Sequence, residues 1–227
     1  MPRERFDHEM RRLAERVVEL GGLAETAVRD SVAALQKQEL DKARALIEAD
    51  RRINEMRFEM ENEALLLIAT QQPVAGDLRA LASVFEIATE LERIADYAKG
   101  IGTITLAIGR KPLLEPLPDL GRMAELACGM LHRSLQAYLD QDAHLAASIP
   151  REDNLVDELY EKIYRRLVAQ LLNDPQAIEE ALHLTWVAHN LERVADRVGN
   201  ICERVVFWVT GKAEEMTDDS GPRRSGS

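Results

Sequence analysis

Two pairs of acidic residues have a spacing that suits metal binding, Glu92 with Asp96 and Glu192 with Asp196. Residues four apart on a helix lie on one face, one turn from each other. Two negative charges in this position repel by a few tenths of a kcal/mol. Both pairs interrupt rows of apolar residues, and a carboxylate removed from water needs a cation or hydrogen-bond donors. Residues that face these pairs on a neighbouring helix would complete such a site.

The first pair is expected to face Asp50 and Asn54. Residues equidistant from the turn of an antiparallel helical hairpin lie side by side, because both helices rise about 1.5 Å per residue. With the turn at Pro73, Asp50 lies opposite Asp96 and Asn54 lies opposite Glu92. These four residues are predicted to meet at one level of the hairpin.

The second pair is expected to face two further aspartates. With the turn between Asp174 and Pro175, equidistance sets one aspartate opposite Asp196 and the other opposite Glu192. The aspartates are Asp153 and Asp157. Pro150 precedes them and should kink or restart their helix, which affects the register of Asp153.

Oxygen ligands without cysteine indicate a site for a hard cation, namely Mg²⁺, Mn²⁺, Ca²⁺ or iron, with Zn²⁺ a further candidate. Asn54 offers a neutral oxygen, so the first site should bind more weakly. His189 lies three residues before Glu192 and could either add an imidazole ligand or have a structural role. In the alternative interpretation, the acids pair with arginines on the helix faces. The arginines in question are Arg51, Arg93, Arg166 and Arg193.

The elements that carry these residues are predicted to be six long helices. Apolar residues recur at helical spacing between the prolines, and Asp174-Pro175 is a typical helix start. The hexapeptide Leu91-Glu-Arg-Ile-Ala-Asp96 returns 100 residues later as Leu191-Glu-Arg-Val-Ala-Asp196. We therefore expect an all-α fold of two similar three-helix bundles, a tandem repeat, rather than a chance likeness between helices. The predicted helices span residues 4–37, 40–70, 74–108, 119–140, 142–173 and 176–210.

The expected domain organisation follows from the prolines. Residues 1–111 form the first bundle and residues 119–212 the second, with a Pro-rich linker at 112–118. The polar end of the chain, residues 213–227, is expected to be a disordered tail.

Composition narrows the function classes. The chain of 227 residues carries 40 acidic and 29 basic residues, a net charge of −11. That balance argues against nucleic acid as a direct partner. Two cysteines, Cys128 and Cys202, are too few for a disulfide scaffold and fit a reducing compartment. With neither a signal sequence nor an apolar run of membrane length, a soluble cytoplasmic protein is expected.

The motifs resemble those of the PhoU family of regulators of the phosphate-specific ABC transporter. They are Gln71-Gln-Pro-Val-Ala-Gly-Asp-Leu-Arg79, the hexapeptide at 91–96, and Leu191-Glu-Arg-Val-Ala-Asp-Arg-Val-Gly-Asn-Ile-Cys-Glu203. The resemblance covers about residues 4–212. It implies two three-helix bundles that bind metal through their E/D-x-x-x-D motifs. The implied ligands are Glu92, Asp96, Glu192 and Asp196, with Asp50, Asp153 and Asp157 opposite.

The resemblance also implies partners. Such proteins repress phosphate-starvation genes when phosphate is plentiful, by bridging the transporter's ATPase subunit and a membrane sensor histidine kinase. Membrane association would occur only through these partners, and a homodimer is expected. The first half departs from the pattern at Asn54. It also has Gly100 and Gly102 after its motif, where the second half has Asn200 and Glu203 as candidate additional ligands.

Two other functions are alternatives for a helical bundle of this kind. A ferritin-like di-iron protein needs two E-x-x-H motifs, and this chain has only Glu180-Ala-Leu-His183. A histidine phosphotransfer module would use His189, but acids flank it and would repel a phosphoryl group. A protein without enzymatic activity is therefore expected. We further expect that loss of the cations would leave carboxylates in mutual repulsion and loosen the hairpins.

Overall fold

The computed structural model describes residues 2–111, 113 and 118–212. It contains helices α1 (Pro2–Lys37), α2 (Leu40–Gln71), α3 (Ala75–Ile108), α4 (Pro118–Asp140), α5 (Ala143–Ser148), α6 (Asp153–Asn173) and α7 (Ile178–Thr210), with 3₁₀ turns at Ile149–Glu152 and Pro175–Ala177. Most of the predicted linker and the whole predicted tail, residues 213–227, lie outside the described residues.

The prediction of one helix over 142–173 was wrong in detail. The segment consists of α5, a 3₁₀ turn and α6. Pro150 lies in that turn, because proline has no N–H for the helical hydrogen bond and its ring clashes with the preceding turn. Asp174 caps the start of the last segment as expected: its side chain accepts a hydrogen bond from the backbone N–H of Gln176 at 3.0 Å. Here too a 3₁₀ turn precedes the α-helix.

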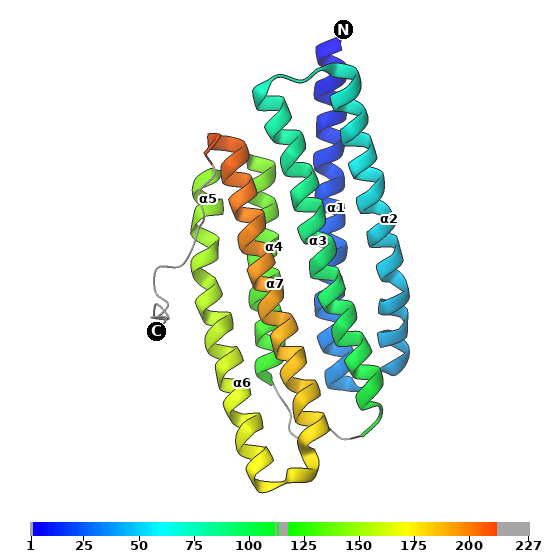
Figure 1. Cartoon of the computed structure of the whole chain (residues 1–227), viewed down its shortest axis with the longest axis vertical. Coiled ribbons are helices and arrows are strands. Elements are labelled where there is room, and N and C mark those ends of the chain that lie inside the picture. The colour runs from blue at the N-terminus through cyan, green and yellow to red at the C-terminus, as the bar shows by residue number, and fades with distance from the viewer. Residues whose placement is uncertain (1, 112, 114–117, 213–227) are drawn as a thin grey trace, which may run out of the picture.

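The helices form two bundles that lie side by side (Figure 1). Helices α1, α2 and α3 form the first, and α4, α6 and α7, with the short α5, form the second. The bundles meet through α3 against α7 and α1 against α4. The all-α tandem arrangement predicted from the repeat is thus confirmed.

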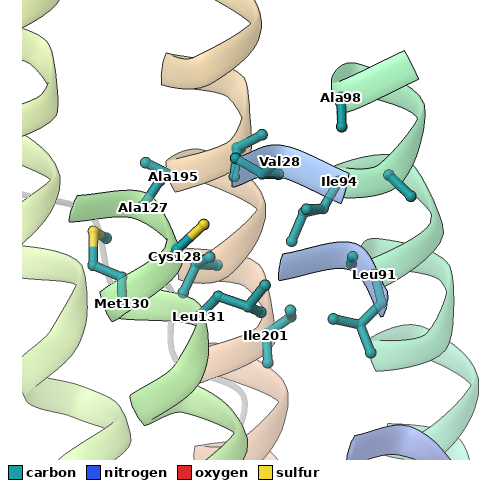
Figure 2. Packing of buried hydrophobic residues seen from close by; sticks show 14 of the residues in the cluster. Val28, Leu91, Ile94, Ala98, Ala127, Cys128, Met130, Leu131, Ala195 and Ile201 are labelled. Atoms are coloured by element: carbon teal, nitrogen blue, oxygen red, sulfur yellow. The ribbon is translucent and has the colours of Figure 1, made fainter. Parts of the chain in front are cut away.

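One apolar core runs through both bundles. Figure 2 shows Val28 of α1, Leu91 of α3, Leu131 of α4 and Ile201 of α7 converging on it. In each repeated hexapeptide the first, fourth and fifth residues are buried, which leaves the glutamate and the aspartate on the flank of the helix. The core therefore fixes the direction in which the acidic pairs point.

Helices α3 and α7 are antiparallel, and an approximate two-fold axis relates them. Asn200 donates a hydrogen bond to Glu90 Oε2 at 3.1 Å. With the repeat spacing of 100, Gly100 is the equivalent of Asn200, and Asn190 is the equivalent of Glu90. These two positions also lie close together, since a β-carbon at Gly100 would lie 3.1 Å from Asn190 Nδ2. Because the axis passes near the two hexapeptides, the acidic pairs of the two halves lie at similar levels along the molecule.

None of the described helices has an apolar stretch of the length needed to cross a membrane.

Candidate functional site

In the first half a lysine joins two of the predicted acids. Lys99 Nζ lies 2.7 Å from Asp50 Oδ2 on α2 and 3.2 Å from Asp96 Oδ1 on its own helix. Asn54 Nδ2 also donates to Asp50 Oδ2, at 3.2 Å. Asp50 and Asp96 therefore share one cation, which agrees with the level that equidistance from Pro73 predicted.

Glu92 lies close to the same group of charges. It is half-buried, and burial raises the pKa of its carboxyl group above the ordinary range. The negative charge of Asp96 raises this pKa further, and Asp50 contributes in the same direction. Arg57 has the opposite effect, since its positive charge favours the ionised carboxylate.

The residues of the first half do not fit a metal ion. A metal ion here would have to be bound by Asp50 and Asp96. The Lys99 ammonium group already donates to an oxygen of each. Asp50 is almost fully buried and Asn54 contributes no charge. An ion bound to Asp50 and Asp96 would have to displace the ammonium group or approach it closely, against the repulsion of two positive charges.

In the second half Glu192 lies near Asp196 and Asp157, and Gly199 stands at the position that Lys99 has in the first half. Burial raises the pKa of the half-buried Glu192, and the charges of Asp196 and then Asp157 raise it further. Glu192 Oε2 faces His189 Nδ1 at 3.2 Å, and the partial neutralisation by His189 lowers this pKa. Asp153 is the first residue of α6 and is half-buried. Carboxylate oxygens with one imidazole are a donor set that fits Mn²⁺, iron or Zn²⁺.

The side chains are not in coordinating positions as they stand. In the part of the chain that the structure describes, no three His, Cys, Asp or Glu side chains lie close enough to hold an ion. Binding in the second half would therefore require rotation of Glu192, Asp196, Asp157 or Asp153, and metal ligation by these residues stays a prediction.

Asn200 and Glu203, the predicted additional ligands, line a groove between α3 and α7 together with Glu86 and Glu90. The Asn200 amide is engaged by Glu90, which also pairs with Arg197 at 3.3 Å. The bond from Asn200 to Glu90 joins the two bundles.

The arginine alternative is seen at Asp196. Arg193 Nη1 lies 2.6 Å from Asp196 Oδ2. Ion pairs with other acids are formed by Arg51 with Glu55, Arg93 with Glu90 and Arg166 with Asp119.

Lys99 and Tyr97 are site residues that the sequence reasoning missed. Lys99 follows Asp96 by three residues, and the repeat has Gly199 in its place, a difference that was visible in the sequence. A hydrogen bond with Tyr97 is the largest effect that raises the pKa of Arg193, so α3 positions the arginine that pairs with Asp196. This link crosses between the bundles and could not be inferred from either hairpin alone.

Comparisons with known proteins agree with the tandem arrangement. The model of the PhoU domain matches residues 17–105 and again 120–205. The phosphate-specific transport system accessory protein PhoU homolog of Caulobacter vibrioides (strain NA1000 / CB15N) is 36% identical over 213 residues, which cover 93% of this chain and 92% of that protein. Its counterpart in Escherichia coli (strain K12), PhoU, is 34% identical over 210 residues, which cover 91% and 86%.

Solved structures give the same result. The crystal structure of PhoU from Pseudomonas aeruginosa has a TM-score of 0.86 and 30% identity, and the match covers 91% of this chain and all of that one. The structure of the phosphate transport system regulatory protein PhoU from Streptococcus pneumoniae has a TM-score of 0.85 and 29% identity, over 92% and 99%.

Proposed function

Because this chain belongs to the PhoU family, we propose that it is an accessory regulator of phosphate transport. In this role it represses the phosphate-starvation response when phosphate is plentiful and modulates phosphate uptake. It does so by contacting the ATPase subunit of the phosphate ABC transporter and the phosphate sensor histidine kinase. The observation that carries the proposal is the match of the PhoU domain to both halves, with relatives of the same name aligned over nearly the whole chain.

The second acidic cluster is the proposed regulatory element. Glu192 and Asp196 on α7, with Asp153 and Asp157 on α6, would hold a divalent or iron cation, and His189 is placed to assist. A bound cation would offset the repulsion of Glu192 by Asp196 and Asp157. Without it, burial and the charges of Asp196 and Asp157 disfavour the ionised form of Glu192, which weakens the packing of α6 on α7.

An exposed apolar surface beside this cluster is the proposed docking site for the ATPase subunit. Residues spaced by four form one row on α6 and another on α7, and ring contacts join the rows: Trp186 with His189 at 5.7 Å, His189 with Tyr160 at 6.4 Å, and Tyr160 with Tyr164 at 6.5 Å between centroids. Exposed apolar patches of this kind mark sites of protein interaction. The exposed members are Tyr164, Val168, Leu172, Ile178, Leu182 and Trp186.

We further propose that the chain acts as a binding protein and not as an enzyme, in the cytoplasm, as a homodimer. Association with the membrane would then occur only through its partners. The position of the single E-x-x-H motif argues against a di-iron enzyme. Its residues Glu180 and His183 line a pocket at the start of α7 with Lys111 and Glu179, apart from the four acids of the second half. Light scattering coupled to gel filtration measures the dimer directly.

Deletion of the gene in its native host tests the regulatory role. Expression of a phosphate-starvation reporter in high phosphate should rise on deletion and return to the repressed level with the wild-type gene. Trp186→Ala should fail to restore repression and should lose capture of the ATPase subunit, whereas Leu65→Ala, an equally exposed site on α2, should behave as wild type. An unchanged reporter after deletion would refute the proposed function.

A further inference from the structure

We propose that Lys99 is a built-in cation that takes the place of a metal ion in the first half, so that metal binding by this chain is confined to the second half. The statement about the second half rests on the proposed metal-dependent function. The statement about Lys99 rests on the first-half contacts alone.

The geometry of Lys99 is that of a bridging cation. Its ammonium group donates to Asp50 Oδ2 at 2.7 Å and to Asp96 Oδ1 at 3.2 Å, so one positive charge joins α2 to α3. The Asp50 side chain is only 6% exposed, whereas that of Lys99 is 38% exposed. The buried carboxylate is therefore compensated by a lysine whose stem reaches it from the surface.

The repeat shows what the second half lacks. Gly199 is the equivalent of Lys99, because the hexapeptides that precede them are 100 residues apart. A β-carbon at Gly199 would meet no other atom within 4 Å, so the position has room for a side chain. The absence of a lysine there is not imposed by packing.

The charges of the two halves differ accordingly. In the first half the set is Asp50, Glu92 and Asp96 with a neutral Asn54 and the positive Lys99. The second half has four carboxylates, and the Arg193 guanidinium that pairs with Asp196 is also held by Tyr97 of α3. By formal charge the second-half set is therefore more negative than the first, and an external cation would offset that charge.

The two hairpins then differ in what closes them. In the α2–α3 hairpin the positive charge of Lys99 joins the two helices, so they stay packed with or without metal. The α6–α7 hairpin depends on a charge from solution. A change in the available cation would act on the exposed surface formed by α6 and α7 and leave the first bundle unchanged.

Equilibrium dialysis against Mn²⁺ alone, with metal per chain measured by mass spectrometry, tests this. We expect the Mn²⁺ bound to wild type to be lost in the double variant E192Q/D196N and unchanged in D50N/D96N. Lys99→Met should gain Mn²⁺, and adding D96N to Lys99→Met should remove the gain. Lys99→Arg, which keeps the charge, should gain none. Gly199→Lys should lose the Mn²⁺ of the second half.

The two proposals fail separately. The role of Lys99 is overturned if D50N/D96N binds less Mn²⁺ per chain than wild type. It is also overturned if a folded Lys99→Met binds no more Mn²⁺ than wild type. Gain in Lys99→Met when wild type binds no Mn²⁺ supports Lys99 as the built-in cation and refutes the metal-dependent second half. If Lys99→Met fails to fold by circular dichroism, the D50N/D96N comparison and Gly199→Lys decide the matter.

Discussion

Arg133 on α4 holds Glu152 of the 3₁₀ turn in a two-pronged ion pair, with Nη2 2.6 Å from Oε2 and Nη1 bonded to Oε1. The pair fixes the turn that contains Pro150 and so sets where α6 begins. Asp153, the first residue of α6, therefore has its position determined by a contact outside its own hairpin.

Glu152→Gln should lower the free energy of unfolding at pH 7 by about 1 kcal/mol or less, since both side chains are partly exposed. The hydrogen bond from Arg133 lowers the pKa of Glu152. The contribution is therefore present above the ordinary pKa of 4.5 and is lost as pH falls through the lower value of the folded state. Urea unfolding at several pH values measures this. In an Arg133→Met background, Glu152→Gln should not change the free energy of unfolding in this pH-dependent way. A change that persists in that background would show that it does not come from the Arg133–Glu152 ion pair.

Lys99→Met should lower the free energy of unfolding by about 2 kcal/mol, because it leaves the buried Asp50 carboxylate without its cation. Combination with Asp50→Asn should recover part of the loss, since the uncompensated charge is then gone. Urea unfolding of the four proteins, in chelator, gives the coupling energy. Simple additivity would mean that the 2.7 Å contact contributes nothing to stability.

Mn²⁺ at about 100 times its dissociation constant should stabilise the wild type by roughly 2.7 kcal/mol. The double variant E192Q/D196N should gain no stability from Mn²⁺. In chelator the same variant should be more stable than wild type, because burial and the charge of Asp196 disfavour ionised Glu192. Thermal unfolding with and without Mn²⁺ tests both statements, and a Mn²⁺-dependent shift retained in the variant would contradict them.

Leu91→Ala should lower the free energy of unfolding by about 2–5 kcal/mol, because the side chain is fully buried in the apolar core. Leu172→Ala is the matched control, since Leu172 is 82% exposed and its loss should change stability by less than about 0.5 kcal/mol. Chemical denaturation distinguishes the two. Equal effects would contradict the burial of Leu91 in the core.

The two cysteines should be unreactive in the folded protein. Burial raises the pKa of Cys128 and of Cys202 to about 12, so neither forms a thiolate at pH 8. A thiol reagent should label both on unfolding in urea and neither before it, apart from slow labelling through opening of the fold. Fast labelling of the native protein would show that one of these thiols is accessible.

Helix positions and the tandem fold were predictable because prolines and apolar spacing act locally. The juxtaposition of Asp50 and Asp96 also followed from the sequence, since it needs only a helix rise and a turn at Pro73. Lys99 was not identified because equidistance locates backbones, whereas a lysine reaches about one helical turn beyond its own position. The bond from Asn200 to Glu90 depends on how the two bundles pack, which neither repeat determines by itself.

The approximate two-fold axis between α3 and α7 has a consequence for the origin of such a chain. A contact that repeats itself when its partners are exchanged is the contact that two identical subunits make in a symmetric dimer. Identical subunits must carry the same residue at equivalent places. When the two copies are joined in one polypeptide, equivalent positions can carry different residues. Lys99 in the first copy and Gly199 in the second are such a difference, which a dimer of identical subunits could not have.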